Sequence, residues 1–259
     1  MLEHRNPHLD HEARRFVSAV CHSPAMAIDE REAMWLFHFQ RGVLSAKQAQ
    51  DCGFTPDAIR HRSRAGGRWQ RLLPGVYLTS TGQPTREQLL TAAQLYAGPS
   101  SLISGLAALR AYELSVPASR RVDVLVPRAR QRTGCAFPAS PAGDRTSVAI
   151  HRATRLPEPE MRDLAIAYAP VARAVADTVR GLSTRQQVRA VVASAVQKRA
   201  CTIRELAAEL ADGPRRGSGL FRSVLAEVAD GSARRPRRSS VTSSGTRACR
   251  CRCSTPSSA

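Results

Sequence analysis

The fold of this chain is decided by residues 43–78, which read VLSAKQAQDCGFTPDAIRHRSRAGGRWQRLLPGVYL. Ser45 is a typical N-cap residue for a short helix over 46–52, and Gly53 follows where a left-handed backbone costs least. Thr55 and Pro56 favour the start of a second helix, which we expect to run to about residue 65. Two helices joined by a tight glycine turn form the unit that places its second helix in a DNA major groove.

The second predicted helix has a basic outer face. At a period of 3.6 residues per turn, Ala58, Ile59 and Ala65 point inward, and the opposite face carries charged side chains. These outer residues are Asp57, Arg60, His61 and Arg64. The helix is therefore expected to present cations to a polyanion such as duplex DNA.

A hairpin is predicted directly after this helix. Two β-prone runs, 68–72 and 76–78, flank the turn Leu73-Pro74-Gly75, so the unit reads as a winged helix-turn-helix over about 29–80. We expect Arg60, His61 and Arg64 to face the major groove, and Arg62, Arg68 and Arg71 to contact phosphates. The complete set of predicted DNA-binding residues is Lys47, Thr55, Asp57, Arg60, His61, Arg62, Arg64, Arg68 and Arg71.

This order of features resembles the N-terminal domain of the bacterial AbiEi family of type IV toxin–antitoxin antitoxins. The resemblance rests on Gly-Phe-Thr at 53–55, Gly-Arg-Trp-Gln-Arg-Leu at 67–72 and Pro-Gly-Val-Tyr at 74–77, and it thins towards residue 230. In that family the winged helix binds the operon's own promoter and the next domain carries antitoxin activity. The resemblance implies a transcriptional regulator that represses its own operon and neutralises a nucleotidyltransferase-like toxin.

Two other readings stay open for the basic helix. It could be a solvated face of a protein that binds no DNA, or part of an RNA-binding or scaffold protein. His61 fits a surface or phosphate-contacting side chain better than a metal ligand, because no partner stands at metal-ligand spacing. The first four cysteines are likewise isolated, so we expect no metal, no other cofactor and no disulfide.

The composition favours a polyanionic partner. The 259 residues carry a net charge of +18, of which seven arginines after Gly231 contribute +7 and the rest of the chain +11. No apolar run approaches the roughly 18 residues of a membrane span, and no secretion signal is recognisable. We therefore expect a cytoplasmic protein with no membrane partner.

The rest of the chain predicts an α+β, mostly helical protein. We expect residues 1–28 to form a disordered or loosely helical leader, a helix over 29–40 to begin the winged unit, and a second domain to cover 81–230. The expected helices there are 85–97, 104–112, 171–180, 184–199, 202–211 and 219–229, and the expected strands are 122–126 and 147–151. Thr202 and Glu205 form a capping box.

Catalysis is not expected from this second domain. Asp123 lies on a predicted strand, and the resemblance implies a nucleotidyltransferase-like fold there. A nucleotidyltransferase needs a Gly-Ser motif and two or three clustered carboxylates for metal and nucleotide, whereas the sequence offers one carboxylate. We predict a non-enzymatic protein.

The tail over 231–259 is rich in Arg, Ser and Cys and is predicted to be disordered. One alternative is an arginine-rich nucleic-acid arm. Another is a frameshift, because synonymous codons for residues 234–256 can be read in a neighbouring frame as an acidic amphipathic helix. That helix resembles the opening of the very-short-patch-repair-like endonuclease domain that often follows this N-terminal module. The alternative function is therefore a truncated DNA endonuclease that has lost its nuclease domain.

Overall fold

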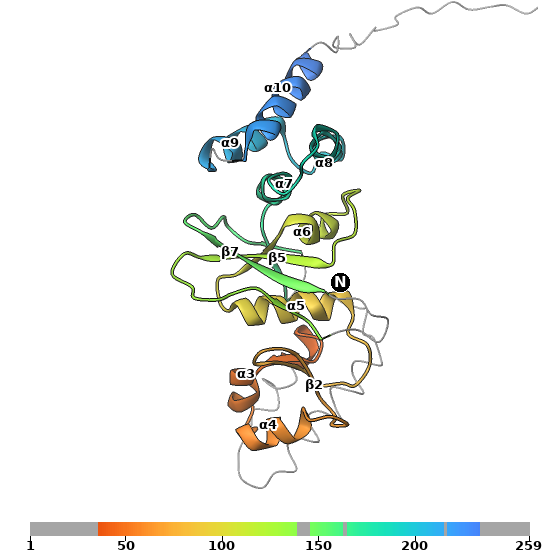
Figure 1. Ribbon diagram of the computed structural model, residues 1–259, viewed down its shortest axis with the longest axis vertical. Helices are drawn as coiled ribbons and strands as arrows, with labels where there is room; N and C mark the ends of the chain where they lie inside the picture. The colour runs from red at the N-terminus through yellow and green to blue at the C-terminus, as the bar shows by residue number, and fades with distance from the viewer. Residues whose placement is uncertain (1–35, 139–145, 163–164, 215–216, 234–259) are drawn as a thin grey trace, which may run out of the picture.

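The computed structural model describes residues 36–138, 146–162, 165–214 and 217–233. The predicted leader, most of the first helix and the tail after residue 233 lie outside these ranges. The described part is elongated, with a small α/β unit at one end, a larger sheet in the middle and a group of helices at the other end (Figure 1). The predicted α+β class is confirmed.

The N-terminal unit has the winged helix-turn-helix arrangement. Its elements are β1 (Val43–Ser45), α3 (Ala46–Asp51), α4 (Pro56–Arg62), β2 (Gln70–Leu73) and β3 (Val76–Leu78). The three strands form an antiparallel sheet in the order β1-β3-β2, in which the β2–β3 hairpin is the wing. The sequence patterns predicted the hairpin but not β1, which is only three residues long.

Local signals account for the two helices. Ser45 Oγ accepts a hydrogen bond from the Gln48 backbone N–H while the Gln48 side chain accepts one from the Ser45 N–H, so a capping box starts α3. Thr55 caps α4 through its hydroxyl. Gly53, with a φ of +84°, supplies the left-handed turn between them.

An aromatic pair closes the corner between the helices. Phe54 is 7% exposed, and its ring meets that of Trp69 edge to face with centroids 5.0 Å apart. Leu36 and Phe37, from the helical residues 36–39, pack into the same cluster. The remaining buried members are Leu44, Ala49, Cys52 and Ile59.

The second helix is shorter than predicted. It ends at Arg62, whose carbonyl accepts a hydrogen bond from the Trp69 N–H, and Gly66 then adopts a φ of +75°. The chain thus turns into the wing before another helical turn can form. The prediction that this helix reaches residue 65 is wrong, and Ala65 is exposed rather than inward.

A six-stranded mixed sheet forms the middle of the molecule, in the order β6-β7-β5-β4-β9-β8. Its strands are β4 (Leu102–Ser104), β5 (Arg121–Pro127), β6 (Cys135–Ala136), β7 (Ser147–Ala153), β8 (Glu160–Met161) and β9 (Ala167–Tyr168). The predicted strands 122–126 and 147–151 correspond to β5 and β7, which pair in parallel. The sequence patterns missed the other four strands, which are two or three residues long.

Helices cover both faces of this sheet. They are α5 (Arg86–Ala97), α6 (Gly105–Ala111), α7 (Val171–Val179), α8 (Arg185–Gln197), α9 (Ile203–Asp212) and α10 (Gly219–Ala233). In Figure 1, α5 lies on one face and α6 and α7 on the other, with α8 to α10 stacked beyond α7. The predicted capping box at Thr202 and Glu205 is present at the start of α9.

Helix α5 joins the two sheets. It contacts β1, β2 and β3 on one side and β4 and β5 on the other. Leu72, Leu73 and Leu78 of the wing sheet consequently belong to the same buried cluster as Leu90 of α5 and Val124 of β5. The wing sheet therefore shares a core with the second domain, whereas the two helices of the winged unit pack in their own cluster. No helix in the described ranges is both long and apolar enough to span a bilayer.

Candidate nucleic-acid interface

Helix α4 presents its charged face to solvent. Asp57, Arg60 and His61 are exposed on the helix, and Arg64 is exposed just beyond its end. Arg60 Nη1 lies 2.5 Å from Asp57 Oδ1, and the two side chains are 78% and 85% exposed. An exposed ion pair of this kind contributes at most about 1 kcal/mol. Arg60 can therefore exchange Asp57 for a base or phosphate acceptor at little cost.

Arg62 has a different environment from these residues. It is half-buried, with its guanidinium carbon 4.8 Å from the centroid of the Phe54 ring. Its Nη1 also donates a hydrogen bond to the Ala58 carbonyl at 3.5 Å. The side chain therefore braces α4 against the inter-helix turn by a cation–π contact. Its predicted phosphate contact stays a prediction.

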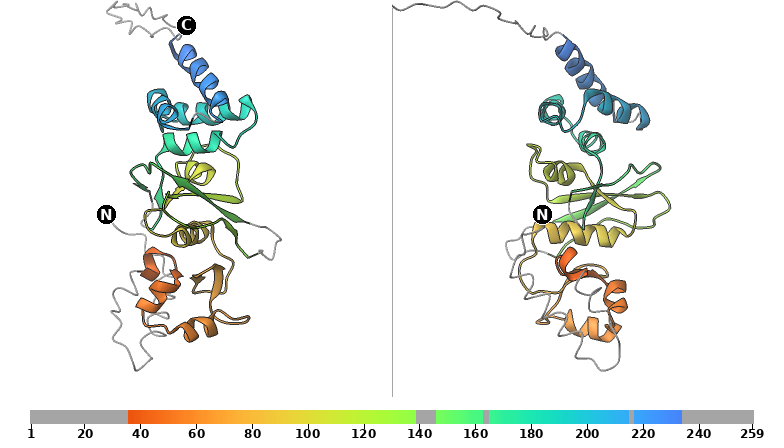
Figure 2. Two further views of the ribbon diagram at one scale, coloured as in Figure 1. Left: turned by 60° about the vertical axis from the view of Figure 1, so that its left-hand side comes forward. Right: turned by 180° about the vertical axis from the view of Figure 1, so that it is seen from behind.

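The wing supplies two more cations. Arg68 is exposed in the loop that leads into β2, and Arg71 is exposed on β2 itself, in register with Tyr77 of β3. Gly75, with a φ of +74°, makes the hairpin turn. The wing and α4 lie in the same end of the molecule (Figure 2).

Lys47 and Thr55 complete the predicted set. Lys47 is on α3, 85% exposed, with its Nζ 2.9 Å from Asp51 Oδ2. The Thr55 hydroxyl accepts a hydrogen bond from the Ala58 N–H, so its first role is to cap α4. A threonine at this position can still turn its exposed side towards a backbone phosphate.

The winged unit carries a strong positive excess. Residues 36–80 contain seven basic residues and two acidic ones. The two acids, Asp51 and Asp57, are the exposed partners of Lys47 and Arg60. Their charges are screened by solvent, so the surface as a whole attracts a polyanion.

A second polar region, a cleft of about 640 Å³, lies between the six-stranded sheet and the ends of α7 and α9. Asp123 of β5 lines it together with Asp177 of α7. The sequence patterns singled out Asp123 alone, because the fold brings in Asp177 from 54 positions further along the chain. No sequence signal marked Asp177, which lies in a helix made mainly of valine and alanine.

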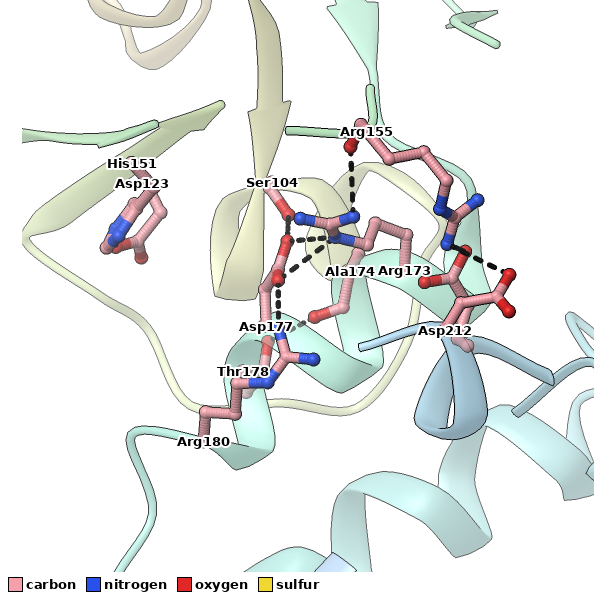
Figure 3. A network of polar contacts seen from close by, with 11 residues as sticks. Ser104, Asp123, His151, Arg155, Arg173, Ala174, Asp177, Thr178, Arg180 and Asp212 are labelled. Atoms are coloured by element: carbon pink, nitrogen blue, oxygen red, sulfur yellow. Dashed lines mark hydrogen bonds and ion pairs between the residues drawn. The ribbon is translucent and has the colours of Figure 1, made fainter. Parts of the chain in front are cut away.

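One part of this cleft, the α7 centre, consists of Ser104, Arg173, Asp177 and Arg180. Ser104 Oγ donates to Asp177 Oδ2 at 2.8 Å, and Arg173 Nε lies 3.0 Å from the same oxygen. Arg180 Nη1 donates to Oδ1 of the same carboxylate at 3.0 Å. Figure 3 shows the three side chains converging on Asp177.

The other part, the sheet centre, consists of Arg121, Asp123 and His151. The Asp123 side chain is 11% exposed, and its Oδ1 lies 2.9 Å from Arg121 Nε and 2.7 Å from His151 Nε2. In Figure 3, Asp123 and His151 lie to one side of the α7 centre. The chain approaches Asp123 closely at Gly105, where an added Cβ would lie 2.8 Å from Asp123 Oδ2.

Within the described ranges, no three His, Cys, Asp or Glu side chains are placed to hold a metal ion. Cys135 and Cys201 form no disulfide with another described residue. The Asp123 and Asp177 carboxylates of the cleft are each surrounded by hydrogen-bond donors.

Comparisons with known proteins assign no family to this chain. No family model matches it, and no curated protein matches it. Among solved structures, the crystal structure of the RV2827C protein from Mycobacterium tuberculosis aligns over 89% of this chain and 82% of that chain, with 17% sequence identity and a TM-score of 0.46.

Proposed function

We propose that this protein is a sequence-reading, non-enzymatic DNA-binding protein that inserts α4 into the major groove of duplex DNA. The observation that supports the proposal is the exposed face of α4, with Arg60, His61 and the adjacent Arg64 directed to solvent. The helix is held by a capped, glycine-turned helix pair and followed by a basic wing. This arrangement is the one in which a second helix reads base edges.

The cations divide into two roles. Arg60 is placed to read bases, because a guanidinium can bind guanine O6 and N7 in a bidentate manner. Arg68 and Arg71, at the wing, are placed to contact phosphates, which fix the register of the protein on DNA without reading sequence. The two groups predict different responses to mutation.

The AbiEi resemblance extends the proposal to the target and to a partner. On that basis the target is the duplex upstream of the protein's own gene, and a nucleotidyltransferase-like toxin is the protein partner. Co-expression with the adjacent open reading frame tests the second part. If that reading frame arrests growth alone and this chain restores growth, the antitoxin role is supported; unrestored growth would argue against it.

The DNA-binding proposal is tested by fluorescence anisotropy with the full chain, the upstream duplex and a scrambled duplex, each at several salt concentrations. We expect preference for the upstream duplex. Arg60→Ala should reduce the difference in binding free energy between the two duplexes by about 1–3 kcal/mol. Arg68→Ala should weaken binding to both duplexes equally and lower the slope of log affinity against log salt concentration by about 1. The matched control is Arg128→Ala, because Arg128 is exposed in the turn after β5 and its replacement removes one charge outside the winged unit.

Equal and steeply salt-dependent binding to both duplexes would contradict the proposal. The winged unit would then supply charge alone. A loss of preference in Arg128→Ala as large as in Arg60→Ala would contradict the assignment of α4 as the reading helix.

A further inference from the structure

The cleft of the second domain takes no part in DNA reading as proposed above. Its volume of about 640 Å³ is within the range of small-molecule sites, which is roughly 300–1,000 Å³. Five arginines and three aspartates line it, so positive charge is in excess on its wall. A cleft of this size and charge needs an explanation beyond packing.

In the α7 centre, two guanidinium groups share one carboxylate. A guanidinium has five N–H donors, but Arg180 uses only Nη1 in hydrogen bonds with described residues. Arg173 uses Nε with Asp177 and Nη1 with the Arg155 carbonyl, at 3.4 Å. Donors of both arginines are therefore left for another acceptor.

The position of these donors is fixed before any ligand arrives. The Arg173 and Arg180 side chains are only 13% and 24% exposed, and the Asp177 side chain is 15% exposed. A Cβ added at Gly213 would collide with the Arg180 guanidinium, so the absence of a side chain there leaves it room. Preorganised donors lose little conformational entropy when they bind an anion.

The sheet centre has the same character. Arg121 and His151 both contact one oxygen of Asp123, and their side chains are 58% and 48% exposed. Arg121 uses Nε alone among its donors in contacts with described residues. The His151 ring donates from Nε2 to Asp123, so its Nδ1 can accept a hydrogen bond from a ligand hydroxyl. Both parts of the cleft thus combine a satisfied carboxylate with unused donors.

We propose that this cleft binds a phosphate monoester of nucleotide size. A phosphate dianion offers several acceptor oxygens, and the planar donors of arginine match that geometry. A carboxylate carries a single charge and two oxygens, so it would occupy fewer of these donors. The phosphate could come from a free nucleotide or from the end of a nucleic-acid strand, and the experiment separates these sources.

The test is isothermal titration calorimetry of the full chain with AMP, adenosine, inorganic phosphate and glutarate. We expect AMP to bind more tightly than adenosine and glutarate. Arg180→Gln and Arg121→Gln should each lower the affinity for AMP about tenfold or more, since each removes a charge-assisted hydrogen bond. Arg128→Gln, which removes an equal charge outside the cleft, should leave the affinity unchanged, and thermal melting of each variant verifies that it is folded.

Arg121 is the safer of the two cleft positions, because its side chain is more than half exposed and the variant is expected to fold. A second readout is the His151 ring proton signal, assigned by its absence in His151→Gln, which should shift on addition of AMP. Arg60→Ala should bind AMP like the parent protein, so failure of DNA reading and failure of this proposal are distinguishable.

Several results would overturn the assignment. They are no binding of any phosphate, equal binding of glutarate and AMP, or equal losses in Arg128→Gln and the cleft variants. To separate the sources, a single strand with a 5′-phosphate is compared with the same strand bearing a 5′-hydroxyl. Preference for the phosphorylated strand, lost in Arg121→Gln, identifies a strand end as the ligand; binding of AMP without that preference identifies a free nucleotide.

Discussion

Substitution of Gly105 by alanine should destabilise the protein through two separable effects. Gly105 has a φ of +64°, a conformation in which an L-residue costs about 1–2 kcal/mol. The added Cβ would also lie 2.8 Å from Asp123 Oδ2, closer than real Cβ atoms approach an oxygen. The carboxylate must then move and loosen its contacts with Arg121 and His151, which adds about 1–2 kcal/mol. We expect Gly105→Ala to lower the free energy of unfolding by about 2–4 kcal/mol in total.

Gly66→Ala is the matched control for the backbone effect. Gly66 has a φ of +75°, and nothing lies within 4 Å of its added Cβ. Gly66→Ala should therefore lower the free energy of unfolding only by the backbone strain, about 1–2 kcal/mol. The difference between the two variants measures the contact with Asp123.

The assay is urea unfolding of the full chain, followed by far-UV circular dichroism. Equal losses for Gly105→Ala and Gly66→Ala would refute the reasoning, because they would show that Asp123 yields without cost. A double-mutant cycle with Asp123→Ala gives a further check. Removal of the carboxylate should relieve the contact part of the Gly105→Ala effect, so the two changes should not be additive.

Three other changes give measurable outcomes. Phe54→Ala should lower the free energy of unfolding by about 3–5 kcal/mol, because the ring fills the helix corner against Trp69; a loss under about 1 kcal/mol would show that the corner repacks. Burial and the hydrogen bond to Glu160 raise the pKa of Tyr112, so the neutral phenol stabilises the fold at pH values below about 10, and this contribution is lost as the pH rises further. Tyr112→Phe should therefore reduce the loss of stability at high pH. Thermal melts with the same pH profile in the variant and the parent protein would contradict this role of Tyr112. Thr202→Ala should lower the free energy of unfolding by about 1 kcal/mol through loss of the α9 cap. Equal melting temperatures of the variant and the parent protein would exclude that role.

Residue patterns predicted the helices and the long strands well. Cap residues such as Thr85 and Thr202 carry their signal within four positions, so the starts of α5 and α9 could be read directly. The two seven-residue strands, β5 and β7, were also predicted. Strands of two or three residues that no turn motif flanks, such as β4, have too few positions for an alternating pattern, and tertiary pairing creates them.

The end of α4 and the cleft of the second domain show what local sequence patterns do not contain. The helix stops at Arg62 because the chain folds back to Trp69, a contact that spacing within the helix does not encode. Asp177 reaches Ser104 across 73 positions, and no local signal marks such a pair. The exposed face of α4 was predictable because a helical period fixes which side chains share a side.

The position of α5 has a practical consequence. The wing sheet rests its apolar side, including Leu73 and Leu78, on a helix that lies beyond residue 85 in the chain. A fragment cut at residue 80 would expose these leucines to water, and it should aggregate or associate with an apolar surface of another molecule. The winged unit is therefore not a transferable module, and recombination that swaps it between proteins must carry α5 along.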